Sequence, residues 1–300
     1  MYYVLKGNYI QNPQITLLTH LSECLSSPKR VILAERQDGC MKKGDWIVNL
    51  AFRILKRDIS LVDGLSFGLA RIRPKPVSIS LKAIKFDQVD HIFWSILADV
   101  FINHVYLPAN FIIRATDIVV DIGAHRGGFT SFAARHTSKT VLAFEPDPIN
   151  FSLLEKHIRQ NNLQNVIAYN AAVGGAPGRS KLYISISSSR HSLYNNQALP
   201  NDNFPHIDVT VLSLDEALEK LELVHLLKMD CEGAEFDILM HAERKTLNKI
   251  EKLAMETHDP IHSGKIKELC DRIKLYFSNI KIVDQKKDNL GYLYAWKSDT

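Results

Sequence analysis

The pattern of apolar and polar positions becomes regular near residue 87. Apolar residues at helical spacing follow Asp87: Ile92, Phe93, Ile96, Leu97, Val100 and Phe101. This spacing is typical of a helix with one buried face. Asp is a common N-cap residue, and Pro cannot continue a helix. The sequence therefore predicts a helix that is capped by Asp87 and ended by Pro108.

From residue 117 onward, short runs rich in β-branched residues alternate with helical segments. The predicted strands are 118–121, 140–145, 166–169, 224–229 and 250–256. Five helices are predicted: one that ends near His136, one that begins at Asp147–Pro148, one over 215–221, one that follows Gly233, and one over 263–277. Such alternation predicts an α/β domain whose mostly parallel sheet is covered on both faces. Segments 180–187 and 207–212 read as an antiparallel ribbon, and 280–283 with 292–296 as a hairpin that closes the sheet.

The pattern is weaker in residues 1–85. Short apolar runs alternate there with polar and glycine-containing breaks, and Pro74 and Pro76 stop any helix. We therefore expect an N-terminal extension or small cap domain over 1–85, of α+β or mostly helical structure, and one α/β domain over 86–300. Two roles are open for the extension: selecting the substrate, or forming the interface of a homo-oligomer.

Composition narrows the classes of partner. The chain has 300 residues, with 37 basic and 33 acidic side chains and a formal net charge of +4. That excess is too small to favour a nucleic-acid partner. The four cysteines form no CxxC pair, the N-terminus lacks a signal-peptide pattern, and polar residues interrupt the apolar stretch at 91–113. We therefore expect a cytoplasmic protein with reduced thiols and no membrane span.

A glycine-rich turn follows the strand at 118–121. In VVDIGAHRGG, Gly123, Gly127 and Gly128 let the backbone approach a ligand closely and begin a helix. Glu145 ends the next predicted strand, 24 positions after Asp121. A carboxylate at such a position can accept hydrogen bonds from ribose hydroxyls. Together the turn and the acid predict a site for a nucleoside cofactor.

The glycine spacing separates two classes of cofactor. A turn that binds a nicotinamide dinucleotide has the pattern GxGxxG, packed against a pyrophosphate. Here Gly123 and Gly127 are four positions apart, and Asp121 precedes them. A carboxylate repels a pyrophosphate and attracts the ammonium group of a methionine moiety. This contrast favours S-adenosylmethionine over a dinucleotide.

Five ordered segments carry a resemblance to a known family. VVDIGAHRGG, VLAFEPDP, YNAAVGG, SLDEAL and LLKMDCEGAEFDIL resemble the FkbM-type S-adenosylmethionine-dependent methyltransferases over about residues 90–260. The resemblance implies a Rossmann-like class I methyltransferase fold, with a mostly parallel seven-stranded sheet and helices on both faces. It also implies S-adenosyl-L-methionine as methyl donor, and O-methylation of a small molecule or a sugar or glycan hydroxyl.

Carried over by position, the resemblance assigns the cofactor contacts. The methionine half would lie against Asp121, Gly123, Ala124 and Gly127, the ribose against Glu145 with Pro146 and Asp147 beside it, and the adenine near Ala171 and Ala172. His125 and Arg126 depart from the family, which often has Asn and a small or hydrophobic residue there. Arg126 could steer an acidic substrate or point to solvent, and we favour solvent because exposed Arg is the usual case.

Three residues are candidates for the catalytic base. Asp230 and Glu232 follow the fourth core strand, where these folds place substrate-side groups; they could equally be a charge pair favoured at a helix N-terminus. His258 follows the fifth strand, and neutral imidazole accepts protons near neutral pH. An exposed or satisfied histidine is the alternative there. The spacing does not show that the three side chains converge, so no metal site is predicted.

Two further residues carry weaker expectations. His191 could border the substrate, and Tyr106 is expected to pack rather than to reach the cofactor. The favoured function is methyl transfer from S-adenosylmethionine to a small-molecule or glycan hydroxyl. The enzyme alternative is a nicotinamide-dependent oxidoreductase, which the glycine spacing disfavours. The other alternative is a non-catalytic nucleoside-binding scaffold, against which the intact set of Asp121, glycines and Glu145 argues.

Overall fold

The computed structural model describes residues 60, 63–64, 75–109, 111–185, 187–194, 205–258, 265–285 and 290–298. The chain divides into two compact units, Met1–Trp94 and Ser95–Thr300. Most of the predicted extension, 1–85, lies outside the described residues. Its proposed structure, its role and the boundary near residue 85 stay predictions.

The first unit contains a β-hairpin followed by the start of a helix. Strands β1 (Val77–Leu81) and β2 (Ile84–Val89) pair antiparallel around a turn at Lys82 and Ala83. Both turn residues have positive φ, +48° and +62°. Residues of the left-handed region suit tight hairpin turns because their twist matches that of the paired strands.

The prediction that Asp87 caps the following helix is wrong. Asp87 lies in β2, where its Oδ1 accepts a hydrogen bond from the Ser78 hydroxyl at 2.6 Å. The cap is Asp90, whose Oδ1 accepts the amides of Ile92 and Phe93 at 3.0 and 2.8 Å. Helix α5 (His91–Ala98) continues into the π-helix η2 (Asp99–Asn103). It ends at His104, in the left-handed region, before the Pro108 that was expected to stop it.

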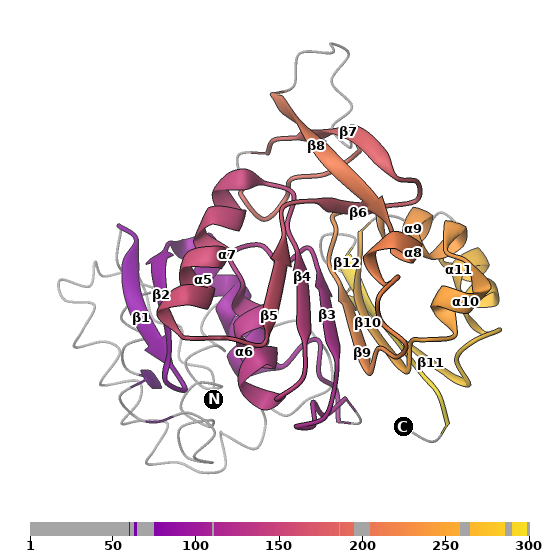
Figure 1. The fold of residues 1–300 in the computed structure, drawn as a ribbon, viewed down its shortest axis with the longest axis horizontal. Helices are drawn as coiled ribbons and strands as arrows, with labels where there is room; N and C mark the ends of the chain where they lie inside the picture. The colour runs from indigo at the N-terminus through magenta and orange to yellow at the C-terminus, as the bar shows by residue number, and fades with distance from the viewer. Residues whose placement is uncertain are drawn as a thin grey trace, which may run out of the picture. The chain divides into compact units, whose positions relative to one another are not determined.

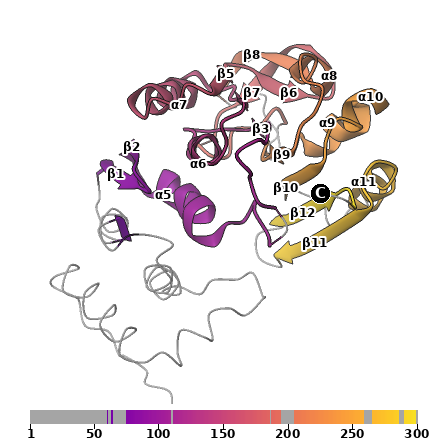
Figure 2. The same cartoon turned by 60° about the horizontal axis from the view of Figure 1, so that its bottom comes forward.

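The second unit is built on a seven-stranded sheet with the order β11-β12-β10-β9-β3-β4-β5. Its strands are β3 (Val119–Ile122), β4 (Val141–Phe144), β5 (Val166–Tyr169), β9 (Leu226–Met229), β10 (Lys252–His258), β11 (Asn279–Gln285) and β12 (Leu290–Trp296). The five strands from β10 to β5 are parallel, and β12 runs antiparallel between β10 and β11. Figure 2 shows the β11–β12 hairpin at one edge of this sheet. The predicted mostly parallel seven-stranded sheet is therefore confirmed.

Helices cover both faces of this sheet, as predicted (Figure 1). One face carries α6 (Gly128–His136) and α7 (Pro148–Gln160). The other carries α8 (Leu214–Ala217), α9 (Glu235–His241), α10 (Arg244–Leu247) and α11 (Lys265–Ile273). The inner strands β3, β4 and β9 are buried on both faces, and on one of these faces Val120 and Ile122 join the core under α9 and α11. Among the described residues, no helix is long and apolar enough to cross a membrane.

A smaller sheet follows β5. Its three strands are β6 (Ala172–Gly174), β7 (Gly178–Tyr183) and β8 (His206–Ser213), in the order β6-β8-β7. Strands β7 and β8 form the predicted antiparallel ribbon, and β6 adds to it in parallel. Figure 1 shows this small sheet beyond one end of the large one. Its residues Ala172, Val173 and Leu182 line the cavity described next.

Candidate active site

A cavity of about 860 Å³ lies at the carboxyl ends of β3, β4, β9 and β10. In an open α/β sheet, this edge is where ligands bind, beside the point at which strand order reverses. That reversal falls between β3 and β9 here. The predicted site residues on the cavity wall are Gly123, Ala124, Glu145, Pro146, Ala171, Ala172, Asp230 and Glu232. Asp121, Gly127 and Asp147 are described but lie outside this lining set.

The loop after β3 requires its glycines. Gly123 has φ +75°, and a Cβ there would lie 1.7 Å from the backbone oxygen of Asp230. Gly127, at the N-terminus of α6, has φ +83°, and its Cβ would lie 2.5 Å from Cδ1 of Leu154. Only glycine fits such contacts in the left-handed region without strain. These glycines bring the β3 loop against β9 on one side and α7 on the other.

Asp121 is completely buried beneath this loop. Its Oδ1 lies 2.9 Å from Nζ of Lys228, and its Oδ2 accepts the Thr130 hydroxyl at 2.6 Å. Lys228 also donates to the backbone oxygen of Gly123 at 2.8 Å. Asp121 thus fixes the loop through a buried ion pair, and it reaches the cavity only through the lysine, which lines the wall.

Sequence reasoning missed Lys228. Burial opposes its charge, but the neighbouring carboxylates of Asp121 and Asp230 outweigh this effect and raise the pKa of Lys228. The ammonium also lies 5.2 Å from the centre of the Tyr106 ring, within the range of a cation–π contact. A signal was available, because a lone lysine inside the apolar run 226–229 must have a buried partner.

Glu145 stands at the end of β4 with both carboxylate oxygens engaged by the backbone. Oε2 accepts the amide of His125 at 2.7 Å, and Oε1 accepts the amide of Asp147 at 2.9 Å. Burial raises the pKa of Glu145 to about 7, although these two hydrogen bonds oppose the rise. A carboxylate oxygen can accept more than one hydrogen bond. The side chain lines the cavity and keeps acceptor capacity for hydroxyl groups there.

Asp147 closes the first turn of α7, as predicted. Its Oδ1 accepts the amides of Ile149 and Asn150 at 2.6 and 3.1 Å. Its Oδ2 lies 3.1 Å from Nε2 of His191. Burial opposes ionisation, but the hydrogen bonds from His191, Asn150 and Ile149 outweigh it and lower the pKa of Asp147. From outside the cavity lining, Asp147 thus holds the start of α7 and His191 in the part of the wall beside Glu145.

Segment 187–193 covers this side of the cavity. The Ser188 hydroxyl lies 3.1 Å from Nε2 of His125 and accepts from Arg126 at 3.2 Å. The Ser188 carbonyl accepts from the Asn150 amide at 3.1 Å. The favoured expectation that Arg126 points to solvent is wrong, because this residue is only 8% exposed. The segment and the start of α7 enclose it. His191, which we expected from the sequence could border the substrate, lines the cavity.

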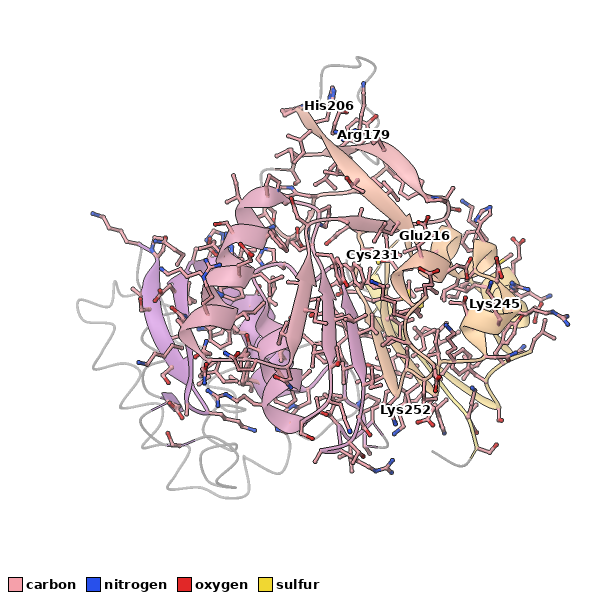
Figure 3. All side chains as sticks on the ribbon, viewed as in Figure 1. Arg179, His206, Glu216, Cys231, Lys245 and Lys252 are labelled. Atoms are coloured by element: carbon pink, nitrogen blue, oxygen red, sulfur yellow. The ribbon has the colours of Figure 1, made fainter. Side chains whose placement is uncertain are left out.

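Four acidic residues of the cavity lining form what we call the acidic wall. Asp99, Asp230, Glu232 and Glu256 all line the cavity, together with Tyr106. The neighbouring Cys231, labelled in Figure 3, follows Asp230 after β9 and also lines it. Burial, and to a smaller extent the charge of Asp230, raise the pKa of Asp99 to about 6, while its hydrogen bond from Asn103 opposes the rise. A carboxylate with a pKa near neutrality can exchange protons at physiological pH.

Two members of the acidic wall were predicted, Asp230 and Glu232, and Asp99 and Glu256 were not. Tyr106 was expected to pack, and it does so while its hydroxyl also contacts two carboxylates. The third predicted base, His258, ends β10, but its side chain lies outside the described part of the structure. Among the described side chains, no group of three His, Cys, Asp or Glu could hold a metal ion.

Known proteins with sequences similar to this chain are methyltransferases. The family model described as the methyltransferase FkbM domain matches residues 121–294. Methyltransferase 1 of Beauveria bassiana (strain ARSEF 2860) is 28% identical over 180 residues, covering 54% of this chain and 72% of that protein. The 31-O-demethyl-FK506 methyltransferase FkbM of Streptomyces tacrolimicus is 24% identical over 190 residues, covering 54% and 73%.

Several solved structures are also similar to this chain. Methyltransferase FkbM from Methylobacillus flagellatus KT is 18% identical, with a TM-score of 0.44, over 69% of this chain and 54% of that one. This chain thus spans about half the length of that solved protein. The resemblance predicted from the five ordered segments is confirmed by the family match.

Proposed function

The chain belongs to the methyltransferase FkbM family, and from this premise we propose that it transfers a methyl group from S-adenosylmethionine to an oxygen atom. The proposed acceptor is the hydroxyl of a small molecule, such as a sugar or glycan. The observation that carries the proposal is the cavity at the carboxyl ends of the strands, whose lining contains both Glu145 and the acidic wall.

The residues on the Glu145 side fit a nucleoside. The Glu145 carboxylate, held by two backbone amides, would accept hydrogen bonds from both ribose hydroxyls. Pro146, Ala171 and Ala172 provide an apolar surface for the adenine. The donor set and the small side chains thus match the chemistry of the cofactor, while Asp147 and Gly127 support this wall from outside the cavity.

The methionine half of the cofactor would lie against the loop after β3. Gly123 and Ala124 line the cavity there, and Asp121 supports them through Lys228. When bound, S-adenosylmethionine supplies a methyl group on a positively charged sulfur. Asp99, Asp230 and Glu256 would make the surrounding field negative, which favours a cation in this part of the cavity.

The chain itself would contribute to the reaction by positioning the acceptor, excluding water from the cavity and supplying a base. Segment 187–193 and the loop 123–126 bound the cavity and would exclude water from it. Holding the acceptor in line would supply most of the acceleration. A wall carboxylate or the imidazole of His258 would receive the acceptor proton. Asp230, Glu232 and His258 are the proposed candidates for this role, and Asp99 and Glu256 join them.

The family match does not favour a nicotinamide-dependent oxidoreductase. Detection of methyl transfer would distinguish an enzyme from a non-catalytic nucleoside-binding scaffold. We propose calorimetric titration with S-adenosylmethionine, S-adenosylhomocysteine and NAD. We expect both adenosyl sulfur compounds to bind and NAD not to bind. Methyl-labelled S-adenosylmethionine should then be incubated with a panel of sugar and small-molecule alcohols. Binding of NAD alone would refute the proposal, and cofactor binding without methyl transfer to any alcohol would indicate a different acceptor or a scaffold.

A further inference from the structure

Tyr106 joins carboxylates that come from two separate strands. Its hydroxyl lies 2.8 Å from Oδ2 of Asp230, just after β9, and 3.3 Å from Oε2 of Glu256, in β10. The residue is 6% exposed. Its ring meets the rings of Phe129 and Tyr292 edge-on, at centroid distances of 5.7 and 6.0 Å. Packing against these two rings fixes where the hydroxyl lies.

The Tyr106 hydroxyl has one proton to donate. The 2.8 Å contact with Asp230 has the length of a normal O–H···O hydrogen bond, whereas the 3.3 Å contact with Glu256 is longer than usual. Burial, followed by the charges of Asp230 and Glu256, raises the pKa of Tyr106 well above 10. The hydroxyl therefore stays protonated, and it remains a donor to Asp230 over the whole physiological range.

Glu232 lines the same cavity but is anchored in a different way. Its backbone lies in the left-handed region at φ +54°, and its carbonyl accepts the Ser192 hydroxyl at 2.6 Å. This contact fixes the main chain of residue 232. The Asp230 carboxylate is held through its Oδ2, which accepts the Tyr106 hydroxyl at 2.8 Å. Orientation of a reacting group to within a fraction of an ångström matters for catalysis, and Tyr106 supplies it for Asp230.

We propose that Asp230 is the carboxylate that faces the reacting hydroxyl, and that Tyr106 is the positioning residue that orients it. This inference rests on the proposed methyl transfer. The acceptor oxygen gives its proton to Asp230 and forms a bond to the methyl carbon, while the electron pair of the breaking carbon–sulfur bond stays on sulfur. The Asp230 side chain is 28% exposed, so the proton can pass from it to solvent.

A binding experiment tests this arrangement without a known acceptor. Sinefungin carries an ammonium-bearing carbon in place of the methylated sulfur of S-adenosylmethionine, and S-adenosylhomocysteine carries neither charge nor methyl there. A carboxylate that faces the reacting centre pairs with the ammonium, which strengthens binding about tenfold or more. We therefore expect the intact protein to bind sinefungin at least about tenfold more tightly than S-adenosylhomocysteine, measured by calorimetry near neutral pH.

Four variants separate the residues. Asp230→Asn should remove most of the sinefungin preference, and Tyr106→Phe should reduce it about threefold or more, because it removes only the orienting hydroxyl. Glu232→Gln should leave the preference unchanged. Tyr294→Phe is the matched control, since the Tyr294 hydroxyl donates to the backbone oxygen of Val105 rather than to a carboxylate. Affinity for S-adenosylhomocysteine should stay within about twofold throughout, which also shows that each variant is folded.

The outcomes separate this inference from the proposed function. If the intact protein binds neither compound, the proposed cofactor is wrong. If it binds both equally, or if Glu232→Gln abolishes the preference, Asp230 is not the facing carboxylate. If Tyr106→Phe leaves the preference unchanged, Tyr106 does not orient it. Should Tyr106→Phe fail to fold, the comparison of Asp230→Asn with Glu232→Gln still decides which acid faces the reacting centre.

Discussion

Replacing Glu145 by glutamine should change how the stability of the ligand-free protein depends on pH. Burial raises the pKa of Glu145 from 4.5 to about 7. A carboxyl whose pKa is higher in the folded state stabilises the fold in its protonated form. Its contribution is therefore complete below about pH 4.5 and is lost as the pH rises to about 7. One pH unit corresponds to about 1.4 kcal/mol, so the full contribution is about 3 kcal/mol.

Urea unfolding followed by circular dichroism at about pH 5 and about pH 7.5 measures this effect. About 2 kcal/mol of the Glu145 contribution should disappear between these two values. The loss of stability should be smaller by this amount in Glu145→Gln. Asp99, whose pKa burial raises to about 6, titrates in the same range, but it contributes to both proteins and cancels in the comparison.

The control is Glu155→Gln, on the exposed surface of α7, where the glutamate pairs with Arg159 at 3.6 Å. This variant should show the pH dependence of the unaltered protein. In Glu145→Gln, the new side-chain amide would face one backbone N–H unfavourably, but that penalty is the same at both pH values. Equal pH dependence in Glu145→Gln and in the unaltered protein would refute the assignment of a raised pKa to Glu145.

Two further predictions concern the loop after β3. Asp121→Asn should lower the free energy of unfolding by about 3–5 kcal/mol, because buried Lys228 loses the nearer of its two counter-charges and keeps only Asp230, at 4.0 Å. Adding Lys228→Met should restore part of the loss in urea unfolding, and strictly additive losses would contradict the pairing. Gly123→Ala should lower stability by about 2 kcal/mol or more and weaken S-adenosylhomocysteine binding, since its Cβ would lie 1.7 Å from the oxygen of Asp230. Gly178→Ala, where φ is +144° and no atom lies within 4 Å of the new Cβ, tests alanine at positive φ without a clash, and a loss in Gly123→Ala no larger than this one would contradict the steric explanation.

Local sequence signals predicted the architecture because they act over a few residues. The pair Asp147–Pro148 caps and begins α7 with contacts inside one turn, so its sequence was sufficient. The helix start near residue 90 was misplaced because two aspartates precede the same apolar run. Pairing of β2 with β1 decides between them: Asp87 joins the hairpin through Ser78, which leaves Asp90 to cap the helix.

The site was only partly predictable, because its contacts join distant segments. Glu145 and the glycines stand at fixed distances from β3, and that spacing is visible in the sequence. The partners of Tyr106 lie 124 and 150 positions away, and no periodicity relates them. Arg126 was assigned to solvent from the general behaviour of arginine, whereas Ser188, 62 positions later, encloses it. Burial of this kind depends on tertiary packing alone.

The electrostatic argument for S-adenosylmethionine rests on the acidic wall rather than on Asp121. The sequence argument used the charge of Asp121 to disfavour a pyrophosphate, yet Lys228 lies 2.9 Å from that carboxylate and compensates its charge. Beyond the effect of burial, Glu256, Asp99 and Asp230 raise the pKa of Tyr292, so the field at this wall is negative. Such a field repels a pyrophosphate and attracts a sulfonium ion. Preference for the adenosyl sulfur compounds over NAD should therefore depend on the acidic wall, and it should persist in a folded Asp121→Asn/Lys228→Met protein.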